Sequence, residues 1–448
     1  MKANFHPPQL NLLLVRSVQS IAPPIARFFY KIELCLSPDD LALLNSLKGE
    51  RVLLLPNHPT FDDPIAIFLL SAQLGQTFYY LAAYEQFNGL LGSIIKQLGA
   101  YSIRRGLADR NSIAQTVELL SQDGCKLVIF AEGGCSFQND TVMPFREGAV
   151  QMAFQAMKKT LKENKSLPNF YVVPVSIKYR YPHDMSATIE KTLGRLERSL
   201  SIDPTPNTDA YERLRAIAAR VLVKIEGDYG LYHPQIARES SWNERIARLR
   251  ELVLQGCEQR LGIPSVPDDP IRERTYRIEY AFKTKKDDDT SKEIIAVSEG
   301  LTNNTQNFEE LLKQDELIEK SIIRLLNFDA IYDGYVAENP TKERFLDTLT
   351  RLEREVFNID RPSPKGLRKT QIKIGSLINL KDSFADYQRD RKGTVSAITL
   401  KIQQRVQENL DKDKRGMIGG PVNHLGLSSN LNPPMKTCQP SHEVLLLE

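Results

Sequence analysis

Between about residues 50 and 180, short apolar runs alternate with segments that have a helical pattern. An uninterrupted apolar run of roughly four to eight residues is typical of a strand that is buried on both faces of a sheet. Such runs occupy residues 51–55, 77–82, 100–103, 127–130 and 170–177. Because helical segments separate them, these runs predict crossover connections and a mostly parallel sheet flanked by helices, which is an α/β fold.

The character of the sequence changes after residue 183. The segment that follows is strongly charged and has mainly helical patterns, one of which begins with a possible capping box of Ser241 and Glu244. A charge run at residues 283–289 predicts a solvated loop. The helices expected in this segment lie at residues 241–261, from Pro270 onward, at 307–326 and at 340–357.

The α/β character returns near the end of the chain. Residues 371–375 have a strand pattern, and residues 394–410 have the pattern of an amphipathic helix. We therefore predict an α/β core of residues 36–183 and 370–412, interrupted by a mainly helical insertion at residues 184–369. The remaining residues, 413–448, are rich in Gly, Pro, Asn and Ser and predict a flexible tail.

Residues 1–35 form an apolar arm in which cations interrupt hydrophobic residues such as Leu12, Leu13, Phe28 and Phe29. No stretch of the sequence approaches the roughly 20 apolar residues that span a bilayer, and no signal-peptide pattern is present. The arm is therefore either a segment that packs on the core or an interfacial segment that lies among lipid headgroups. On the second interpretation we expect a cytoplasmic protein that attaches peripherally to a membrane surface.

Charge and cysteine content exclude several classes of protein. The net charge of +3 over 448 residues is small for a nucleic-acid binder, and no stripe of interleaved aromatic and arginine residues is present. The five cysteines are dispersed without a C-x-x-C pair, which predicts reduced thiols in a cytosolic compartment. Neither the cysteines nor the histidines have metal-ligand spacing, so we expect no bound metal.

The segment Leu55-Pro-Asn-His58-Pro-Thr-Phe-Asp-Asp63 lies where a buried strand ends and a helix begins. Ligands bind at that edge of open α/β sheets. Acyl transfer to an alcohol needs a general base, usually a histidine, and a carboxylate that fixes its tautomer. His58 and Asp63 are close enough in sequence for one turn to bring them together. The alternative is that an aspartate caps the helix and His58 is an incidental loop residue.

Two other segments carry residues with a positional meaning. Arg104 and Arg105 precede Gly106 at a strand end, where two guanidinium groups suit a phosphate. The alternative interpretation is a surface salt-bridge pair. Pro174 lies inside an apolar run, which predicts a sheet edge or a bulge rather than a central ladder.

A glycine-rich turn follows the apolar run at residues 127–130. It contains Glu132, Gly133, Gly134 and Ser136. Glycines let backbone N–H groups approach an anion or a polar substrate closely, although an ordinary strand-to-loop turn has the same composition.

In this order and at these spacings, the segments resemble the motif blocks of the glycerolipid acyltransferase family, which includes the glycerol-3-phosphate and lysophosphatidate acyltransferases. His58 and Asp63 match the N-H-x4-D block of that family, and Arg104, Arg105 and Gly106 match its arginine block. Phe130, Glu132, Gly133 and Ser136 match its F-P-E-G-x-x-S block. Residues 144–149, which include Arg146, resemble its P-F-K-x-G-A segment, and Pro174 matches its proline block. The resemblance covers roughly residues 50–180.

The resemblance implies a mechanism in which His58 deprotonates a hydroxyl of glycerol phosphate, lysophosphatidate or a related lipid, while Asp63 orients His58. The hydroxyl would attack the thioester of acyl-CoA or acyl-carrier protein, so no cofactor beyond this co-substrate is implied. The substrate-binding residues that the resemblance implies are Arg104, Arg105, Gly106, Glu132, Gly133, Gly134, Ser136, Arg146 and Pro174. The expected partners are the acyl donor, a glycerolipid acceptor and a membrane surface, with no nucleic acid.

The third block departs from the family pattern. Ala131 replaces its proline, and Gly134 and Cys135 replace its Thr-Arg pair. The loss of this cation puts a lysophosphatidate acceptor in doubt, and Arg146 is a candidate to compensate for it.

The insertion and two other functions remain open. Residues 184–369 have no counterpart in compact family members, and their candidate roles are to shape an acyl tunnel, to bind a carrier protein or to contact the membrane. One alternative function is a non-catalytic lipid-binding or scaffolding protein on the same fold. Another is a metal-dependent hydrolase that uses His58, Asp62 and Asp63.

Overall fold

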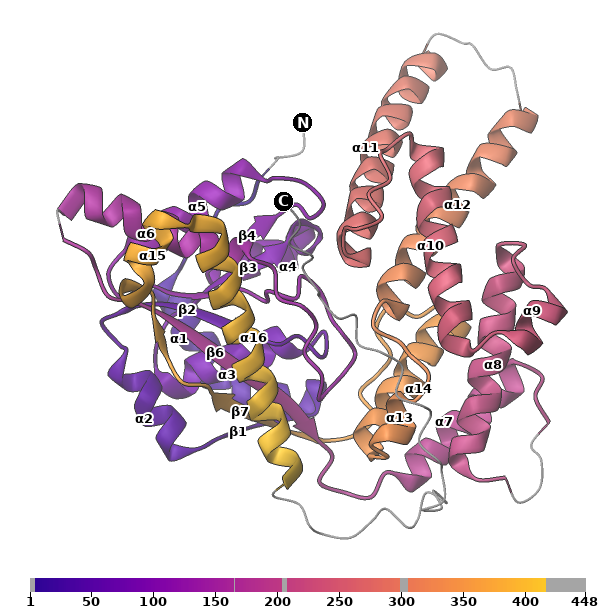
Figure 1. The fold of residues 1–448 in the computed structure, drawn as a ribbon, viewed down its shortest axis with the longest axis horizontal. Coiled ribbons are helices and arrows are strands. Elements are labelled where there is room, and N and C mark those ends of the chain that lie inside the picture. The colour runs from indigo at the N-terminus through magenta and orange to yellow at the C-terminus, as the bar shows by residue number, and fades with distance from the viewer. Residues whose placement is uncertain (1–4, 165, 204–207, 299–304, 416–448) are drawn as a thin grey trace, which may run out of the picture.

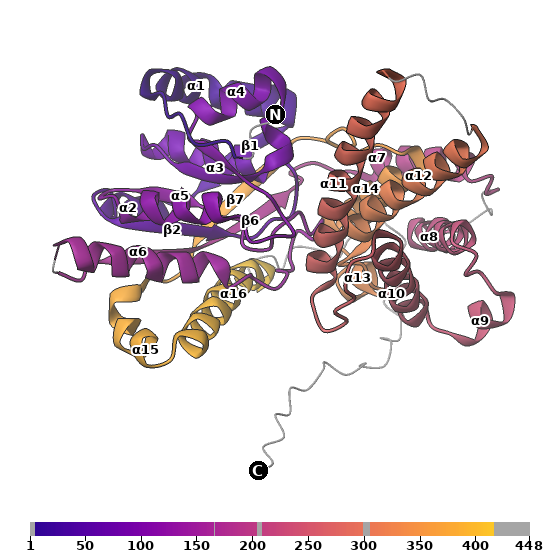
Figure 2. The same ribbon diagram turned by 90° about the horizontal axis from the view of Figure 1, so that it is seen from above.

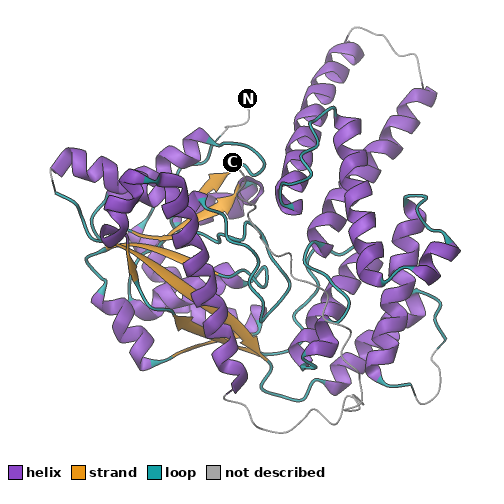
Figure 3. Cartoon of the chain, in the orientation of Figure 1, coloured by secondary structure: helices purple, strands orange, loops and turns teal. Residues whose placement is uncertain are grey.

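The computed structural model describes residues 5–164, 166–203, 208–298 and 305–415. Figure 1 shows an α/β core and, beside it, a group of helices that is formed by the middle of the chain. Figure 2 shows that helices cover both faces of the sheet in the core. The colouring of Figure 3 makes the division clear, because the strands of the described residues all lie in the core, and the described residues of the second part form helices and loops.

The core is built on an eight-stranded sheet with the order β1-β7-β6-β2-β5-β3-β4, and β8 pairs with β6. The strands are β1 (Ile32–Leu36), β2 (Arg51–Pro56), β3 (Tyr79–Ala83), β4 (Ala100–Ile103), β5 (Lys126–Val128), β6 (Phe170–Arg180), β7 (Arg368–Ile374) and β8 (Ile378–Asn379). Only the pairs of β6 with β7 and with β8 are antiparallel. This mostly parallel sheet between helices confirms the predicted α/β fold.

Each face of the sheet has its own hydrophobic core, and β2 contributes to both. Leu53 and Leu55 point into the core under α5, α6, α15 and α16, whereas Val52 and Leu54 point into the core under α1, α2 and α3. This alternation explains the uninterrupted apolar run, because both sets of side chains are buried. The helices of the core are α1 (Leu12–Ile25), α2 (Pro38–Ser46), α3 (Asp63–Leu74), α4 (Gly89–Gln97), α5 (Arg110–Ser121), α6 (Gly148–Asn164), α15 (Phe384–Arg389) and α16 (Arg391–Arg415).

Pro174 lies neither at a sheet edge nor in a bulge of the β2–β6 pairing, whose register is continuous, so the prediction of an edge or a bulge is wrong. It pairs with Leu55 in β6, which is a central strand between β2 and β7. On the other side of β6, pairing with β8 ends at Val172 and pairing with β7 begins at Val175. Pro174 lies in this interval, where neither β7 nor β8 pairs with β6. A proline is tolerated there because its missing backbone N–H is not needed for a ladder hydrogen bond. The Pro174 carbonyl accepts a hydrogen bond from the N–H of Gly375 at 2.8 Å.

The helical part lies between β6 and β7 in sequence. Its helices are α7 (Ser186–Ser199), α8 (Ala210–Asp228), α9 (Pro234–Glu239), α10 (Trp242–Leu261), α11 (Ile271–Ser298), α12 (Thr305–Phe328), α13 (Tyr335–Glu338) and α14 (Lys342–Phe357). The predicted capping box at the start of α10 is present, with Ser241 and Glu244 in reciprocal hydrogen bonds. The loop predicted at residues 283–289 is wrong, because these residues continue α11. One reason is visible at Lys283, whose Nζ pairs with Glu279 one turn earlier and with Glu85 of the core.

The N-terminal arm is mainly helical and has one buried side. Gln19 on this side donates hydrogen bonds to Ser71 in α3 and to the carbonyl of Gln76. The opposite side leaves Leu13 83%, Phe28 69% and Phe29 67% exposed. Among the described residues, no helix combines the length and the hydrophobicity that crossing a membrane requires. The predicted flexible tail falls mostly outside the described residues, since α16 reaches Arg415.

Candidate active site

Asn57, the residue directly after β2, fixes the start of the loop that carries His58. Its amide is fully buried and bridges to β6, with Nδ2 donating to the carbonyl of Ile177 at 3.0 Å and Oδ1 accepting the N–H of Ile177 at 2.7 Å. This two-point contact replaces a strand pairing beyond the end of β2. It sets the direction in which the chain leaves the sheet, and therefore where His58 lies.

His58 and Asp63 are in contact. His58 Nδ1 lies 2.6 Å from Asp63 Oδ2, and Asp63 is the first residue of α3 with no exposed surface. The carboxylate also accepts the backbone N–H of Thr60 at 2.9 Å and the Thr60 hydroxyl at 3.1 Å. With Asp63 accepting at Nδ1, the neutral imidazole carries its proton there and presents its lone pair at Nε2.

Tyr179 in β6 completes the environment of Asp63, and the sequence analysis missed it. Its hydroxyl donates to Asp63 Oδ1 at 2.7 Å. Burial, and next the nearby Asp63 carboxylate, raise the pKa of the Tyr179 phenol well above its usual value, so the phenol remains a donor. A tyrosine in a predicted buried strand was the available signal, because a buried tyrosine hydroxyl generally needs a hydrogen-bond partner.

The two faces of the His58 ring are covered. The Phe130 ring lies 4.3 Å from the imidazole, centroid to centroid. Cys135 Sγ lies 3.5 Å from Nε2 and 3.8 Å from Nδ1. Since these two distances are similar, the sulfur sits over the ring and not on the lone-pair axis of Nε2. Burial, and next Asp63, raise the pKa of the Cys135 thiol well above its usual value, so a reactive thiolate is disfavoured.

Glu132 holds the His58 loop through a hydrogen bond to its backbone. Its Oε1 accepts the backbone N–H of His58 at 2.9 Å, and the residue is 2% exposed. Burial raises the pKa of the Glu132 carboxyl to about 8, although the Arg272 guanidinium opposes the shift. Ser136 contributes to the same loop contact, since its backbone N–H donates to the carbonyl of His58 at 2.8 Å. Both residues therefore hold the position of His58 in this structure.

The two arginines after β4 are each paired with carboxylates. Arg104 Nε lies 3.3 Å from Asp109, which also caps α5. Arg105 lies 3.5 Å from Glu85 and 3.6 Å from Glu279 of α11, and its guanidinium stacks on Tyr276 at 4.3 Å from the ring centroid.

Arg146 has the same kind of partner. Its Nη1 lies 3.1 Å from Glu273 of α11, and its guanidinium lies 5.4 Å from the Tyr276 ring centroid. The structure thus brings Arg105 and Arg146 together around one tyrosine, although they are far apart in sequence. Arg104 pairs with Asp109 instead and does not share the Tyr276 ring.

Helix α11 lies directly on the second and third motif blocks. The Tyr276 hydroxyl donates to the carbonyl of Gly133 at 2.8 Å. A Cβ atom at Gly106 would lie 2.3 Å from the Tyr276 carbonyl, and one at Gly134 would lie 2.5 Å from the Tyr276 hydroxyl. These two glycines are therefore needed for the approach of α11, in addition to any role in binding a substrate.

Arg272 supplies a cation beside the third block, where the family pattern has an arginine. Its guanidinium donates to the carbonyls of Gly134 at 2.6 Å and of Cys135 at 3.1 Å, and it pairs with Asp329 at 2.5 Å. The cation comes from the helical part, more than a hundred residues later in the chain, which explains why sequence reasoning did not find it.

A protein family model matches the part of the chain that carries most of this site. Residues 42–178 match the family model described as Acyltransferase. A search of curated proteins found no match to the chain. The matched residues include β2, the His58–Asp63 pair, the arginines after β4, the third block and most of β6. The chain therefore contains, at residues 42–178, an acyltransferase domain of the glycerolipid acyltransferase family.

Proposed function

We propose that the protein is an acyl-thioester-dependent O-acyltransferase in which His58 is the general base. The observation that carries this proposal is the 2.6 Å contact between His58 Nδ1 and Asp63, which leaves Nε2 free to accept a proton. A binding or scaffolding protein has no need of a base oriented in this way. The Cys135 thiol lies against the His58 ring, but burial raises its pKa and disfavours the thiolate, which suits a reaction in which the acceptor hydroxyl attacks directly.

The proposed step transfers the acyl group from sulfur to oxygen. The acceptor hydroxyl loses its proton to His58 Nε2 as its oxygen attacks the thioester carbonyl of acyl-CoA or acyl-carrier protein. The carbon–sulfur bond then breaks, and the proton on His58 passes to the leaving thiolate. Asp63 stabilises the imidazolium that forms, and Tyr179 together with Thr60 holds Asp63 in place.

The acceptor is proposed to be a hydroxyl of glycerol phosphate, lysophosphatidate or a related lipid. Arg105 and Arg146 lie around Tyr276 beside the third block, and both now pair with glutamates of α11. A phosphate bound there would have to replace Glu273 and Glu279 as the partner of these arginines. We therefore propose that phosphate binding and displacement of these carboxylates occur together.

We also propose peripheral attachment to a membrane surface on the cytoplasmic side. Exposed apolar side chains gather on α4, on α1 and on residues 26–30 directly after α1, and Figure 2 shows α1 and α4 side by side. Residues 9 and 11, just before α1, donate backbone hydrogen bonds to the end of α4 at 3.0 and 2.9 Å. The exposed apolar residues of this surface are Leu12, Leu13, Ile21, Phe28, Phe29, Leu90, Leu91 and Ile94. A cluster of this kind is unusual on a surface that meets only water.

The proposed function is tested by incubating the purified protein with radiolabelled acyl-CoA or acyl-carrier protein and a panel of acceptors. The panel contains glycerol 3-phosphate, lysophosphatidate, and their counterparts without phosphate. We expect label in an ester product that depends on both a donor and a hydroxyl acceptor. Binding of lipid without ester formation under every pairing would instead support the scaffolding alternative.

A further inference from the structure

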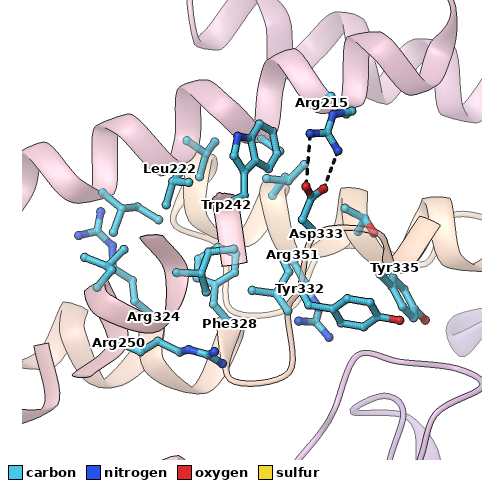
Figure 4. A pocket seen from close by; sticks show the side chains of 18 of the residues that line it. Arg215, Leu222, Trp242, Arg250, Arg324, Phe328, Tyr332, Asp333, Tyr335 and Arg351 are labelled. Carbon is cyan, nitrogen blue, oxygen red and sulfur yellow. Dashed lines mark hydrogen bonds and ion pairs between the residues drawn. The ribbon is translucent and has the colours of Figure 1, made fainter. Parts of the chain in front are cut away.

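The helical part contains a cavity of about 140 Å³ between α8, α10, α12 and α14. Figure 4 shows the cavity with Trp242 and Leu222 on one side and Phe328 on the other. Its residues all belong to the helical part except Gln138, which follows the third motif block. None of the residues in contact with the His58 ring lines it, so the cavity is separate from the proposed catalytic centre.

The wall of the cavity is almost entirely apolar. It lies at the seam between two hydrophobic cores, one containing Leu214 and Val221 of α8 and the other containing Val253 of α10 and Leu325 of α12. Leu249 packs against both cores and also lines the cavity. An apolar wall of this size favours a hydrocarbon group over water.

Four arginines line the cavity, and two of them, Arg215 and Arg324, are paired with Asp333 and Glu355. The other two, at one end of the cavity, have no carboxylate partner of this kind among the described residues. In Figure 4 the guanidinium groups of Arg250 and Arg351 lie on the same side of the cavity, across from Trp242. Arg250 donates to the carbonyl of Asp329 at 2.7 Å, and its Nε is buried without a partner among the described residues. Arg351 is 2% exposed and donates to the carbonyls of Ser136 and Asn327.

Positive charge exceeds negative charge at this end. The carboxylates that face the two guanidinium groups are Asp329, which pairs with Arg272 at 2.5 Å, and Asp347, which accepts hydrogen bonds from Asn139 and Tyr335. No ion pair within 4.0 Å joins a described carboxylate to Arg250 or Arg351. Burial lowers the pKa of both arginines, which reflects the cost of holding these cations away from water. A bound anion would reduce that cost.

We infer that this cavity is a binding site for a single fatty acyl chain with an anionic head, of the class represented by a free fatty acid. The hydrocarbon lies between α8 and α10 against Trp242, and the carboxylate meets Arg250 and Arg351. The inference does not depend on the proposed acyl transfer, because it concerns binding at residues outside the catalytic centre.

The size of the cavity sets the length of chain that fits. An engineered apolar cavity of about 150 Å³ accommodates a benzene molecule. A cavity of about 140 Å³ therefore suits a chain of medium length, roughly six to ten carbons, before side chains have to move. While the cavity is filling, affinity should rise about fourfold for each methylene, and it should level off for longer chains.

The chain contains a single tryptophan, and it lines the cavity. Intrinsic fluorescence of Trp242 therefore reports on this site alone. The probe is 8-bromooctanoate, whose bromine at the end of the hydrocarbon quenches tryptophan on contact and would lie at the end of the cavity that is opposite Arg250 and Arg351. We expect saturable quenching of the full-length protein.

Three comparisons separate the carboxylate site from unspecific contact and from the donor's own acyl chain. 8-Bromo-1-octanol, which lacks the charge, should bind about tenfold or more weakly, and Arg250→Met should reduce that difference. Leu222→Phe, which fills the cavity, should remove quenching, with circular dichroism and the melting temperature as controls for folding. A non-hydrolysable octanoyl-CoA analogue distinguishes the sources, because the site proposed here is reserved for the free acid and the analogue should not displace the probe.

Several results would overturn the inference. Quenching that is linear and does not saturate, equal affinity for the acid and the alcohol, or unchanged quenching in a folded Leu222→Phe protein would each show a packing void only. Displacement of the probe by the acyl-CoA analogue would show that the cavity receives the donor's acyl chain instead. A His58→Ala protein should bind the probe as the wild type does, so loss of acyl transfer and failure of this inference are distinguishable.

Discussion

The two halves of the active site differ in what builds them. In the His58 half, the contacts that orient His58 come from the α/β core, with Asn57 after β2, Asp63 at the start of α3 and Tyr179 in β6. The arginine half is closed by the helical part, because Glu273, Tyr276 and Glu279 of α11 contact the cations and glycines of the core. The first half is therefore preformed, whereas binding an anion in the second half requires a change in the contacts of α11.

The largest effect on kcat is expected from removing the Asp63 carboxylate, which belongs to the half of the site that contains His58. Asp63→Asn should lower kcat by about 10²–10⁴, because an amide favours the wrong tautomer of His58 and cannot stabilise the imidazolium. Asp62→Asn is the matched control, since Asp62 pairs with Arg368 and not with His58. Steady-state acyl transfer checks both variants. Equal losses for both would contradict a specific role of Asp63.

Glu132, which contacts the His58 loop, should make the free energy of unfolding depend on pH. Its carboxyl pKa is raised to about 8 by burial, so between roughly pH 4.5 and 8 the folded state holds a proton that the unfolded state releases. This group therefore makes the free energy of unfolding fall as pH rises through that window, by at most about 1.4 kcal/mol per pH unit. Glu132→Gln should flatten this slope in denaturant unfolding series. A slope identical to that of the wild type would show that Glu132 is ionised in the folded protein.

The core and the helical part also differ in exposed apolar surface, which predicts where a membrane binds. Phe28 and Phe29 are 69% and 67% exposed on the core. Replacing both with serine should weaken co-sedimentation with anionic liposomes at least about tenfold, because a fully inserted phenylalanine contributes roughly 1.5–3 kcal/mol. Leu252→Ser with Val266→Ser on the helical part is the matched control. Equal weakening by both pairs would argue against attachment through the surface that contains Phe28 and Phe29.

The smallest effect is expected on the KM of variants at the arginine half of the site, which α11 covers. Glu279→Gln removes one carboxylate that competes with phosphate for Arg105, so the KM for a phosphorylated acceptor should fall about two- to fivefold. The KM for the acyl donor should not change. Asp269→Asn, which removes a carboxylate that pairs with Arg277, is the control. A higher KM for the phosphorylated acceptor would show that Glu279 assists binding and does not compete with it.

The same division explains what the sequence could predict. The apolar run of β2 and the five-residue spacing of His58 and Asp63 are local features, so they indicated both a buried strand and a histidine–carboxylate pair. Tyr276 and Arg272 reach the third block from more than a hundred residues away, and no local pattern marks such contacts.

Other errors have the same origin in long-range contacts. The charge run at residues 283–289 suggested a loop, but it continues α11, where Lys283 pairs with Glu85 of the core. Pro174 looked like an edge residue, although the interval between β7 and β8 accommodates it in the centre of the sheet. Strand β1 was not predicted, since its partner β7 is more than three hundred residues later.

The central claim is that His58 acts as the base in acyl transfer, and one measurement tests it most directly. Transfer of radiolabelled acyl groups is compared between the wild type, His58→Ala and His183→Ala, in which an exposed histidine outside the site is replaced. The account predicts a loss of about 10²–10⁴ in kcat for His58→Ala alone, with an unchanged melting temperature. Near-wild-type turnover by a folded His58→Ala protein would contradict it.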